Sequence, residues 1–227
     1  MMPTYNDLSA LIITFKLAGL TTIILLVVGT PLAYWLSRTS WRFKYILEAM
    51  IALPIILPPT VLGFYLLLLL GPNGPIGRFT EFLGIGTLPF TFTGLVVGSF
   101  FYSFPFVVQP LYNSFSSLGK RPREVASTLR ASPPDVFFTI TLPLVRSGFL
   151  TAAVLGFAHT IGEFGVVLMI GGNIPGVTRV LSIAIYEHVE MLEYGNAHFL
   201  SGAMLLLSFF MLLLVYRFNH KGMVIHS

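Results

Sequence analysis

KRPREVASTLRASPPDVFFTITLP, residues 120–143, is the longest polar stretch between hydrophobic segments in a very apolar chain. It carries four cations, Lys120, Arg121, Arg123 and Arg130. Basic loops between membrane spans are retained on the cytoplasmic side of a bilayer. This stretch is therefore predicted to be cytoplasmic, and it orients the rest of the chain.

Local signals predict two short helices within the stretch. Pro122 suits the first position of a helix, where a missing N–H costs nothing, and Glu124 then lies in the first turn, where the helix dipole favours an acid. Residues 124–131 are therefore predicted to form a surface helix. Ser132 is a good N-cap for a second helix, with Asp135 three residues on. The unit can bind anionic headgroups through its cations or dock on another protein, and the pattern fits both.

The composition predicts an integral membrane protein. The 227 residues are 55% hydrophobic and 10% charged, with a mean hydropathy of +0.85, which excludes a soluble globular domain. The pI near 9.5 does not indicate nucleic-acid binding, because most basic residues lie between apolar segments, where retention of positive loops explains them. The chain has no cysteine and hence no disulfide or thiol chemistry.

Five segments reach the roughly 20 apolar residues that a spanning helix needs. They are residues 10–36, 45–70, 92–115, 149–170 and 199–216. An odd number of spans puts the termini on opposite sides. With residues 120–143 in the cytoplasm, only Lys16, Arg78 and Arg179 of the thirteen Lys and Arg fall outside. The sequence therefore predicts an all-α membrane fold of five transmembrane helices, with the N-terminus outside and the C-terminus inside.

Prolines interrupt two of the predicted spans. The second contains Pro54, Pro58 and Pro59, so this helix is predicted to kink and to leave carbonyls unpaired. In hydrocarbon such carbonyls need protein or water beside them. A cavity-lining position and a packing kink both fit, and the same holds for the third span with Pro105 and Pro110.

The fourth span combines small residues with two ionisable ones. Gly148, Ala152 and Gly156 allow a close helix approach, and this face is predicted to meet a second copy of the chain. His159 and Glu163 are four apart and are predicted to share a helix face. Intramembrane ionisable residues normally face a bundle interior or a water-filled path. A proton relay and a structural hydrogen-bonded pair both remain open.

Seven residues of the polar stretch have a characteristic order and spacing: Glu124, Ala126, Ala131, Phe137, Ile140, Leu142 and Pro143. They match the EAA loop of binding-protein-dependent ABC importer permeases, and the chain resembles this family from about residue 11 to residue 217. In the family, the loop is a coupling helix that seats in a cleft of the ATPase subunit. The resemblance implies the type I permease fold in a single transmembrane domain, residues 10–217, with the coupling loop at 120–143.

The resemblance also implies which residues couple the chain to the ATPase: Glu124, Val125, Ala126, Arg130, Ala131, Phe137, Leu142 and Pro143. Two of them depart from the family pattern. Val125 replaces the second motif residue, and Arg130 stands where the family usually has Gly. Because such importers are driven by ATP and need no proton path, the resemblance favours the structural pair for His159 and Glu163.

Partners and cofactors follow from the same resemblance. It implies a homodimer of this chain in the cytoplasmic membrane, two ATPase subunits, and a periplasmic or extracellular oxyanion-binding protein. The sequence has no G-x-x-x-x-G-K-[ST] motif, so ATP and Mg are expected on the ATPase partner and no cofactor on this chain. It has no Ser-His-Asp arrangement or metal-ligand spacing either. The chain is expected to be a transport subunit rather than an enzyme.

Within the family, three stretches most resemble bacterial molybdate permease subunits: GTPLAYWLSRTSWRFK with LPIILPPTVLG, RPREVASTLRASPPDVFFTITLPL, and GEFGVVLMIGGNIPGVTR. Molybdate or tungstate is the expected substrate, and a sulfate permease subunit is the alternative. A stand-alone channel or secondary transporter, coupled through His159 and Glu163, is a third interpretation, but no inverted repeat is found. The predicted translocation path comprises Pro58, Pro59, Thr60, Ser99, Ser103, Thr160 and Glu163.

Overall fold

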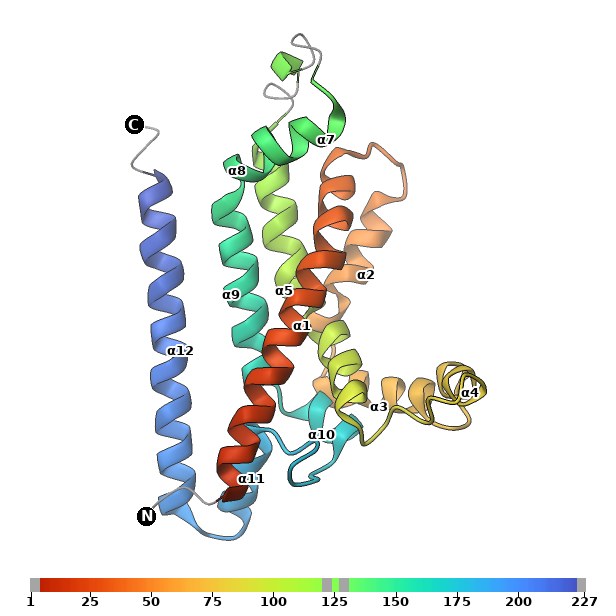
Figure 1. Cartoon of the computed structure of the whole chain (residues 1–227), viewed down its shortest axis with the longest axis vertical. Coiled ribbons are helices and arrows are strands. Elements are labelled where there is room, and N and C mark those ends of the chain that lie inside the picture. Colours follow the sequence, from red (N-terminus) through yellow and green to blue (C-terminus); the bar gives the residue numbers. More distant parts are fainter. Residues whose placement is uncertain (1–4, 120–123, 127–130, 224–227) are drawn as a thin grey trace.

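The computed structural model describes residues 5–119, 124–126 and 131–223, and the regular structure in these residues is helical (Figure 1). The cations Lys120, Arg121, Arg123 and Arg130 of the polar stretch lie outside the described residues. In chain order the helices are α1 (Tyr5–Arg38), α2 (Lys44–Ile56), α3 (Pro59–Leu70), α4 (Pro75–Phe82), α5 (Phe92–Ser117), α7 (Pro133–Asp135), the π-helix η1 (Val136–Thr141), α8 (Leu142–Leu144), α9 (Arg146–Gly162), α10 (Gly165–Gly171), α11 (Leu181–Glu190) and α12 (Tyr194–Met223).

Helices α1, α5 and α9 pack against one another at the centre of the molecule. Their shared core includes Leu25 of α1, Val107 and Leu111 of α5 and Ala152 of α9, all fully buried. The helices approach closely because α9 carries Gly156 at the crossing, where a Cβ atom would lie 2.4 Å from Val107 Cγ2. The small residues of the fourth predicted span thus pack as expected, but inside one chain. They do not by themselves require a second copy.

Three predicted spans are confirmed as long apolar helices. Among the described residues, Asn6–Arg38, Phe92–Ser117 and Tyr194–Arg217 are long and apolar enough to cross a membrane. Two further candidates are interrupted: Pro59–Phe82, which comprises α3 and α4, and a pair of helices, Pro133–Leu144 and Arg146–Gly162, bent by 71°. The described part of the chain therefore has four candidate spans, or five if the bent pair counts as one.

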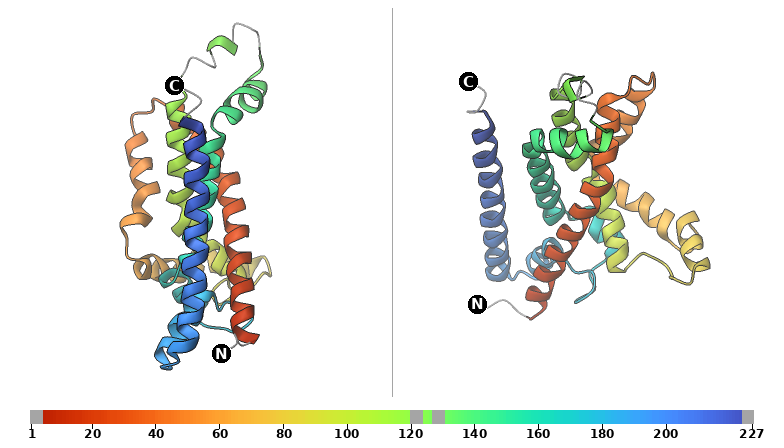
Figure 2. Two further views of the ribbon diagram at one scale, coloured as in Figure 1. Left: turned by 90° about the vertical axis from the view of Figure 1, so that its left-hand side faces the viewer. Right: turned by 45° about the horizontal axis from the view of Figure 1, so that its top comes forward.

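The second predicted span, residues 45–70, is not one helix. Helix α2 continues through Pro54 and ends at Ile56, and α3 begins at Pro59. Leu57 and Pro58 are extended, with ψ of 135° and 133°, and each precedes a proline, which disfavours the helical region. The prolines therefore break the helix. Helices α3 and α4 project to the side of the bundle away from α12 (Figures 1 and 2).

The fourth predicted span, residues 149–170, is also broken. Helix α9 ends at Gly162, Glu163 is extended with ψ of 135°, and α10 begins at Gly165. His159 and Glu163 thus do not share one continuous helix, because the backbone leaves the helix at Glu163. Their side chains nevertheless remain neighbours, with His159 Nδ1 3.6 Å from Glu163 Oε1.

The two ends of the molecule differ in what they carry. Helices α7 and α8, the connection between α1 and α2, and the last described turns of α12 lie at one end (Figure 1). The start of α1 and helix α11 lie at the other. A chain that begins at one end and finishes at the other agrees with an odd number of crossings.

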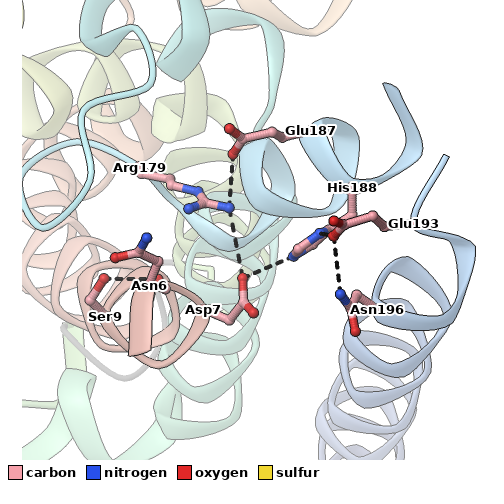
Figure 3. A network of polar contacts seen from close by, with 8 residues as sticks. All are labelled: Asn6, Asp7, Ser9, Arg179, Glu187, His188, Glu193 and Asn196. Carbon is pink, nitrogen blue, oxygen red and sulfur yellow. Dashed lines mark hydrogen bonds and ion pairs between the residues drawn. The ribbon is translucent and has the colours of Figure 1, made fainter. Parts of the chain in front are cut away.

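A buried charge network joins α1, α11 and α12 at the end where α1 begins (Figure 3). The guanidinium of Arg179 lies 2.8 Å from Glu187 Oε2, as an ion pair without hydrogen-bond alignment, and 3.7 Å from Asp7 Oδ1. His188 Nε2 lies 3.0 Å from Asp7 Oδ1, and its Nδ1 lies 2.8 Å from Glu193 Oε2. The network therefore ties the start of α1 to the α11–α12 corner.

Protonation of His188 is expected to strengthen this junction. Burial alone lowers the pKa of His188, but hydrogen bonds with Asp7 and Glu193 outweigh it, so the pKa is raised above 6.5. A raised folded-state pKa gives stability that is fully present below the unfolded pKa and is lost as the pH rises through the folded pKa. We expect wild type to lose about 1 kcal/mol, or about 2–4 °C in melting temperature, as the pH rises from about 6 to about 9.

The purified protein in detergent provides the measurement. His188→Gln is expected to melt at a temperature that changes less over the same pH range, because Gln does not titrate. Equal pH dependence in both proteins would show that His188 does not control this junction.

Candidate functional site

A buried polar cluster joins α5 to the end of α9. Ser99 Oγ donates a hydrogen bond to Glu163 Oε2 at 2.5 Å, and Ser103 Oγ donates to Glu163 Oε1 at 2.6 Å. Ser103 Oγ is also 2.9 Å from His159 Nδ1 and 2.9 Å from Thr160 Oγ1. Ser99 and Ser103 are fully buried, and Thr160 and Glu163 are 2% exposed. Four predicted path residues therefore lie together, but inside the packed chain.

The break after α9 places the Glu163 carboxylate in this cluster. Because the helix ends at Gly162, the side chain of Glu163 reaches α5, while its backbone carbonyl turns toward α11. There the carbonyl accepts a hydrogen bond from Ser182 Oγ at 2.5 Å. A carbonyl freed by a helix end is thus satisfied by protein, as the membrane interior requires.

The two helix breaks meet. A Cβ atom on Gly165, at the start of α10, would lie 3.0 Å from Pro59 Cβ, at the start of α3. Pro58 and Pro59, two of the predicted path residues, form the break itself, and Thr60 is exposed in the first turn of α3. The structure therefore assigns the seven predicted path residues to two neighbouring groups, one at each break.

One face of α5 carries polar side chains along much of its length, on a span for which a cavity-lining position and a packing kink were both left open. Tyr102, Phe106, Gln109 and Asn113 follow one another at spacings of four, three and four, so they share one helix face. The first three are half-buried, and Asn113 is exposed. The signal was present in the sequence as polar residues at helical spacing within an apolar segment.

This face borders a pocket of about 390 Å³ between α1, α2 and α5. Its polar lining comes from Glu48 of α2 and from Gln109, Tyr112 and Asn113 of α5, and its apolar lining includes Leu36 of α1. No local pattern in the sequence predicts that Glu48 and Asn113 lie near each other, since they belong to different predicted spans.

The predicted coupling loop is described in part. Glu124, Val125 and Ala126 are helical; Glu124 is exposed, Val125 is 62% exposed, and Ala126 is 1% exposed. Ala131 N–H donates to the Ala126 carbonyl at 3.2 Å. Arg130 lies outside the described residues. Of the three described residues 124–126, Glu124 and Val125 have exposed side chains, and Ala126 packs against the rest of the chain.

The second helix of the loop begins as predicted. Ser132 is its N-cap, accepting from Asp135 N–H at 3.4 Å and donating to the Asp135 carboxylate. The Phe137 ring lies 5.0 Å from Tyr34 of α1 and 6.5 Å from Phe115 of α5, which fixes the loop to the central helices. Leu142 and Pro143, the last predicted coupling residues, begin the short helix α8, which leads into α9.

The amino-acid sequence is similar to those of known transport proteins. The family described as binding-protein-dependent transport system inner membrane component matches residues 9–221. The Azotobacter vinelandii molybdenum transport system permease protein ModB is 64% identical over 93% of both chains. The Escherichia coli K12 protein of that name is 35% identical over 84% of this chain and 83% of the relative. A probable sulfate transport system permease protein of Zygnema circumcarinatum is 33% identical over 92% and 72%.

Solved structures show the same fold at low identity. A chain of a bacterial ABC transporter that imports the acidic polysaccharide alginate superposes with a TM-score of 0.72 and 16% identity, covering 99% of this chain and 82% of that one. A second structure of a bacterial alginate ABC transporter, in complex with an alginate pentasaccharide-bound periplasmic protein, matches equally well. At this identity the likeness concerns the fold alone.

Proposed function

The chain belongs to the family of binding-protein-dependent transport system inner membrane components, and on that premise we propose that it is the membrane permease subunit of an ATP-driven molybdate importer. The observation that carries the proposal is the 64% identity to a molybdenum permease over 93% of both chains. The identity to a probable sulfate permease is 33%, which makes sulfate the second candidate. The multi-pass helical fold supports a role in translocation.

ATP hydrolysis belongs to a separate subunit in this proposal. The chain has no phosphate-binding loop of the G-x-x-x-x-G-K-[ST] type, so ATP and Mg are assigned to a partner ATPase. The exposed Glu124 and Val125, on a loop fixed to the central helices through Phe137, form the contact with that ATPase. Motion of the ATPase then reaches α9 through Leu142 and Pro143, which begin the short helix that leads into it.

Two permease chains and an external binding protein complete the complex. Two nucleotide sites act most simply on a two-fold symmetric path, which favours a homodimer with two ATPase subunits. A solved neighbour of the same fold is in complex with a periplasmic protein, which supports an external binding protein as the partner that delivers the anion.

The orientation follows from the charges. The predicted cytoplasmic cations Arg38, at the end of α1, Arg42, in the connection, and Lys44, at the start of α2, are at the same end of the molecule as α7 and α8. We therefore place this end in the cytoplasm and the start of α1 outside. The charge network of Arg179 and His188 then lies on the external side, in reach of the binding protein.

The path residues proposed from the sequence fall at the two helix breaks. Irregular backbone at membrane depth is tolerated where it lies against protein or lines a water-filled cavity. Pro58, Pro59 and Thr60 at one break, with Ser99, Ser103, Thr160 and Glu163 at the other, are therefore assigned to the region where the path opens and closes.

Molybdate uptake in a bacterial host that lacks its own molybdate permease tests the substrate. Expression of this chain with its ATPase and binding protein is expected to restore uptake of radioactive molybdate, and a hundredfold excess of sulfate should leave most of it intact. Native mass measurement of the complex should find two copies of this chain and two ATPases. Uptake abolished by equimolar sulfate would favour the sulfate permease instead.

A further inference from the structure

On the premise of the proposed function, we propose that His159 donates a hydrogen bond from Nε2 to the permeating oxyanion, and that Glu163 and Ser103 hold it in the donor form. This assigns a role in transport to a residue that the sequence left between a proton relay and an inert structural pair.

His159 lies at the edge of the buried cluster. Its ring stacks on Phe106 with centroids 3.8 Å apart and planes at 22°, and it lies 4.7 Å from the Tyr102 ring. Its side chain is 18% exposed, whereas Ser103 and Glu163 are buried behind it. Among the described residues, Nδ1 has hydrogen-bond and ion-pair partners and Nε2 has none. The two rings fix the orientation of the imidazole, and Nε2 is the nitrogen left for a ligand.

The surface around His159 is polar in a way that lipid would not tolerate. Tyr102, Gln109 and Asn113 share one face of α5, and none of their side chains makes a hydrogen bond to the part of the chain that the structure describes. On a spanning helix, such groups face protein or a water-filled path. Gln109 and Asn113 line the pocket of about 390 Å³. His159 of α9 therefore lies beside Tyr102, on the same face of α5 that carries Gln109 and Asn113 at the pocket.

The hydrogen atoms of the cluster can be counted. The hydroxyl of Thr160 donates to the Gly156 carbonyl at 2.9 Å, so it has no hydrogen left for Ser103. Ser103 has one hydrogen of its own, and it faces three acceptors: Glu163 Oε1, His159 Nδ1 and Thr160 Oγ1. When that hydrogen points at Glu163 or at Nδ1, Ser103 donates to one of these two atoms and accepts a hydrogen from the other.

The buried pair is expected to be neutral overall, because an uncompensated carboxylate in an apolar interior is costly. One neutral arrangement is an imidazolium beside a carboxylate: Nδ1–H donates to Ser103, Ser103 donates to Glu163, and Nε2 also carries a hydrogen. The other is a carboxylic acid beside a neutral imidazole: Glu163 donates to Ser103, Ser103 donates to Nδ1, and the imidazole hydrogen is on Nε2. Nε2 is a donor in both.

Placing the acid hydrogen on the other carboxyl oxygen is disfavoured. Glu163 Oε2 would then donate to Ser99, whose own hydroxyl hydrogen would lose the partner it has at 2.5 Å. Ser99 is fully buried, and an unpaired buried hydroxyl is destabilising. With the Ser103 hydrogen on Glu163 or on Nδ1, the cluster keeps a hydrogen on Nε2, the form that can bind an anion, without a net buried charge.

Four proteins, reconstituted in vesicles with the ATPase and saturating binding protein, test this role. Glu163→Gln mimics the neutral acid, since its amide can donate to Ser103 and Ser103 can donate to Nδ1, and its molybdate turnover is the reference for the two double variants. His159→Phe added to Glu163→Gln keeps the stacked ring and removes the donor, and turnover should fall about tenfold or more. His159→Gln on the same background restores a donor without the ring and should recover most of the turnover.

Melting temperature and assembly with the ATPase are measured for each variant, and both should stay unchanged. If the Phe variant does not assemble, His159→Leu replaces it in the comparison with Gln. Equal turnover with and without a donor at residue 159 overturns the inference, and so does a collapse of turnover in Glu163→Gln alone, which would show that the carboxylate itself is required. If the wild-type complex carries no molybdate, the proposed function fails first and the inference with it.

Discussion

Glu124→Lys is expected to reduce molybdate-stimulated ATP hydrolysis by more than tenfold and to release the ATPase during purification. Glu124 is exposed on the loop that is fixed to α1 and α5 through Phe137, so a docked partner can reach its carboxylate. Reversing a charge in a docked interface replaces an attraction with a repulsion that costs several kcal/mol.

A matched control separates docking from a general charge effect. Glu81→Lys makes the same change at an exposed residue of α4. This helix projects from the side of the molecule, away from the end that carries α7 and α8 (Figure 1). It should leave ATPase association unchanged. Replacing Lys120 and Arg121 with Gln, which would weaken binding to anionic headgroups, should also have little effect. Normal ATPase association in Glu124→Lys would contradict the coupling role of this loop.

Gly156→Leu is expected to destabilise the packing of the helix core. A Cβ atom there lies 2.4 Å from Val107 Cγ2 and 4.0 Å from Thr22 Oγ1, so a branched side chain must push α9 away from both α5 and α1. Overpacking of this kind costs about 1–3 kcal/mol or more. In a chain of this size that corresponds to a fall in melting temperature of about 2–12 °C.

Gly19→Leu on α1 is the control for this substitution. A Cβ atom at Gly19 meets nothing within 4 Å, while the gain in helix propensity from replacing Gly is the same at both sites. Thermal unfolding of both variants in detergent should therefore separate packing from propensity. Equal melting temperatures would show that the α1–α5–α9 crossing is looser than the described contacts require.

Local signals in the sequence correctly predicted several features. The apolar segments of α1, α5 and α12 and the Ser132 cap follow from residue type and local pattern. The small residues of α9 were expected to meet a second copy, but Gly156 packs inside the chain. Ser99, Ser103, Thr160 and Glu163 were named only as members of the predicted path, and their contacts with one another were not anticipated.

The two helix breaks could not be predicted from local sequence, because they depend on contacts between segments far apart in the chain. The prolines of the second span indicated a kink. Whether the helix kinks or breaks also depends on the segment that packs against it, and here Gly165 of α10 lies against Pro59. Glu163 ends its helix because Ser99 and Ser103 hold its side chain and Ser182 holds its carbonyl. None of these partners is within 18 residues of it in the chain.

Two residues singled out from the sequence are buried in the chain. Arg179, which the charge count placed on the outer side, is 6% exposed and ion-paired with Glu187 and Asp7. Ala126 was assigned to close contact with the ATPase, but it is 1% exposed within this chain. A bulky residue at Ala126 would therefore disturb the chain itself, and Glu124 is the better position at which to test docking.

Molybdate-stimulated ATP hydrolysis, measured together with molybdate uptake in vesicles containing this chain, its ATPase and its binding protein, tests the central claim most directly. The account predicts that both activities require all three proteins and ATP, and that molybdate stimulates hydrolysis more than sulfate does. Uptake by this chain alone without ATP, or hydrolysis stimulated by sulfate but not by molybdate, would contradict it.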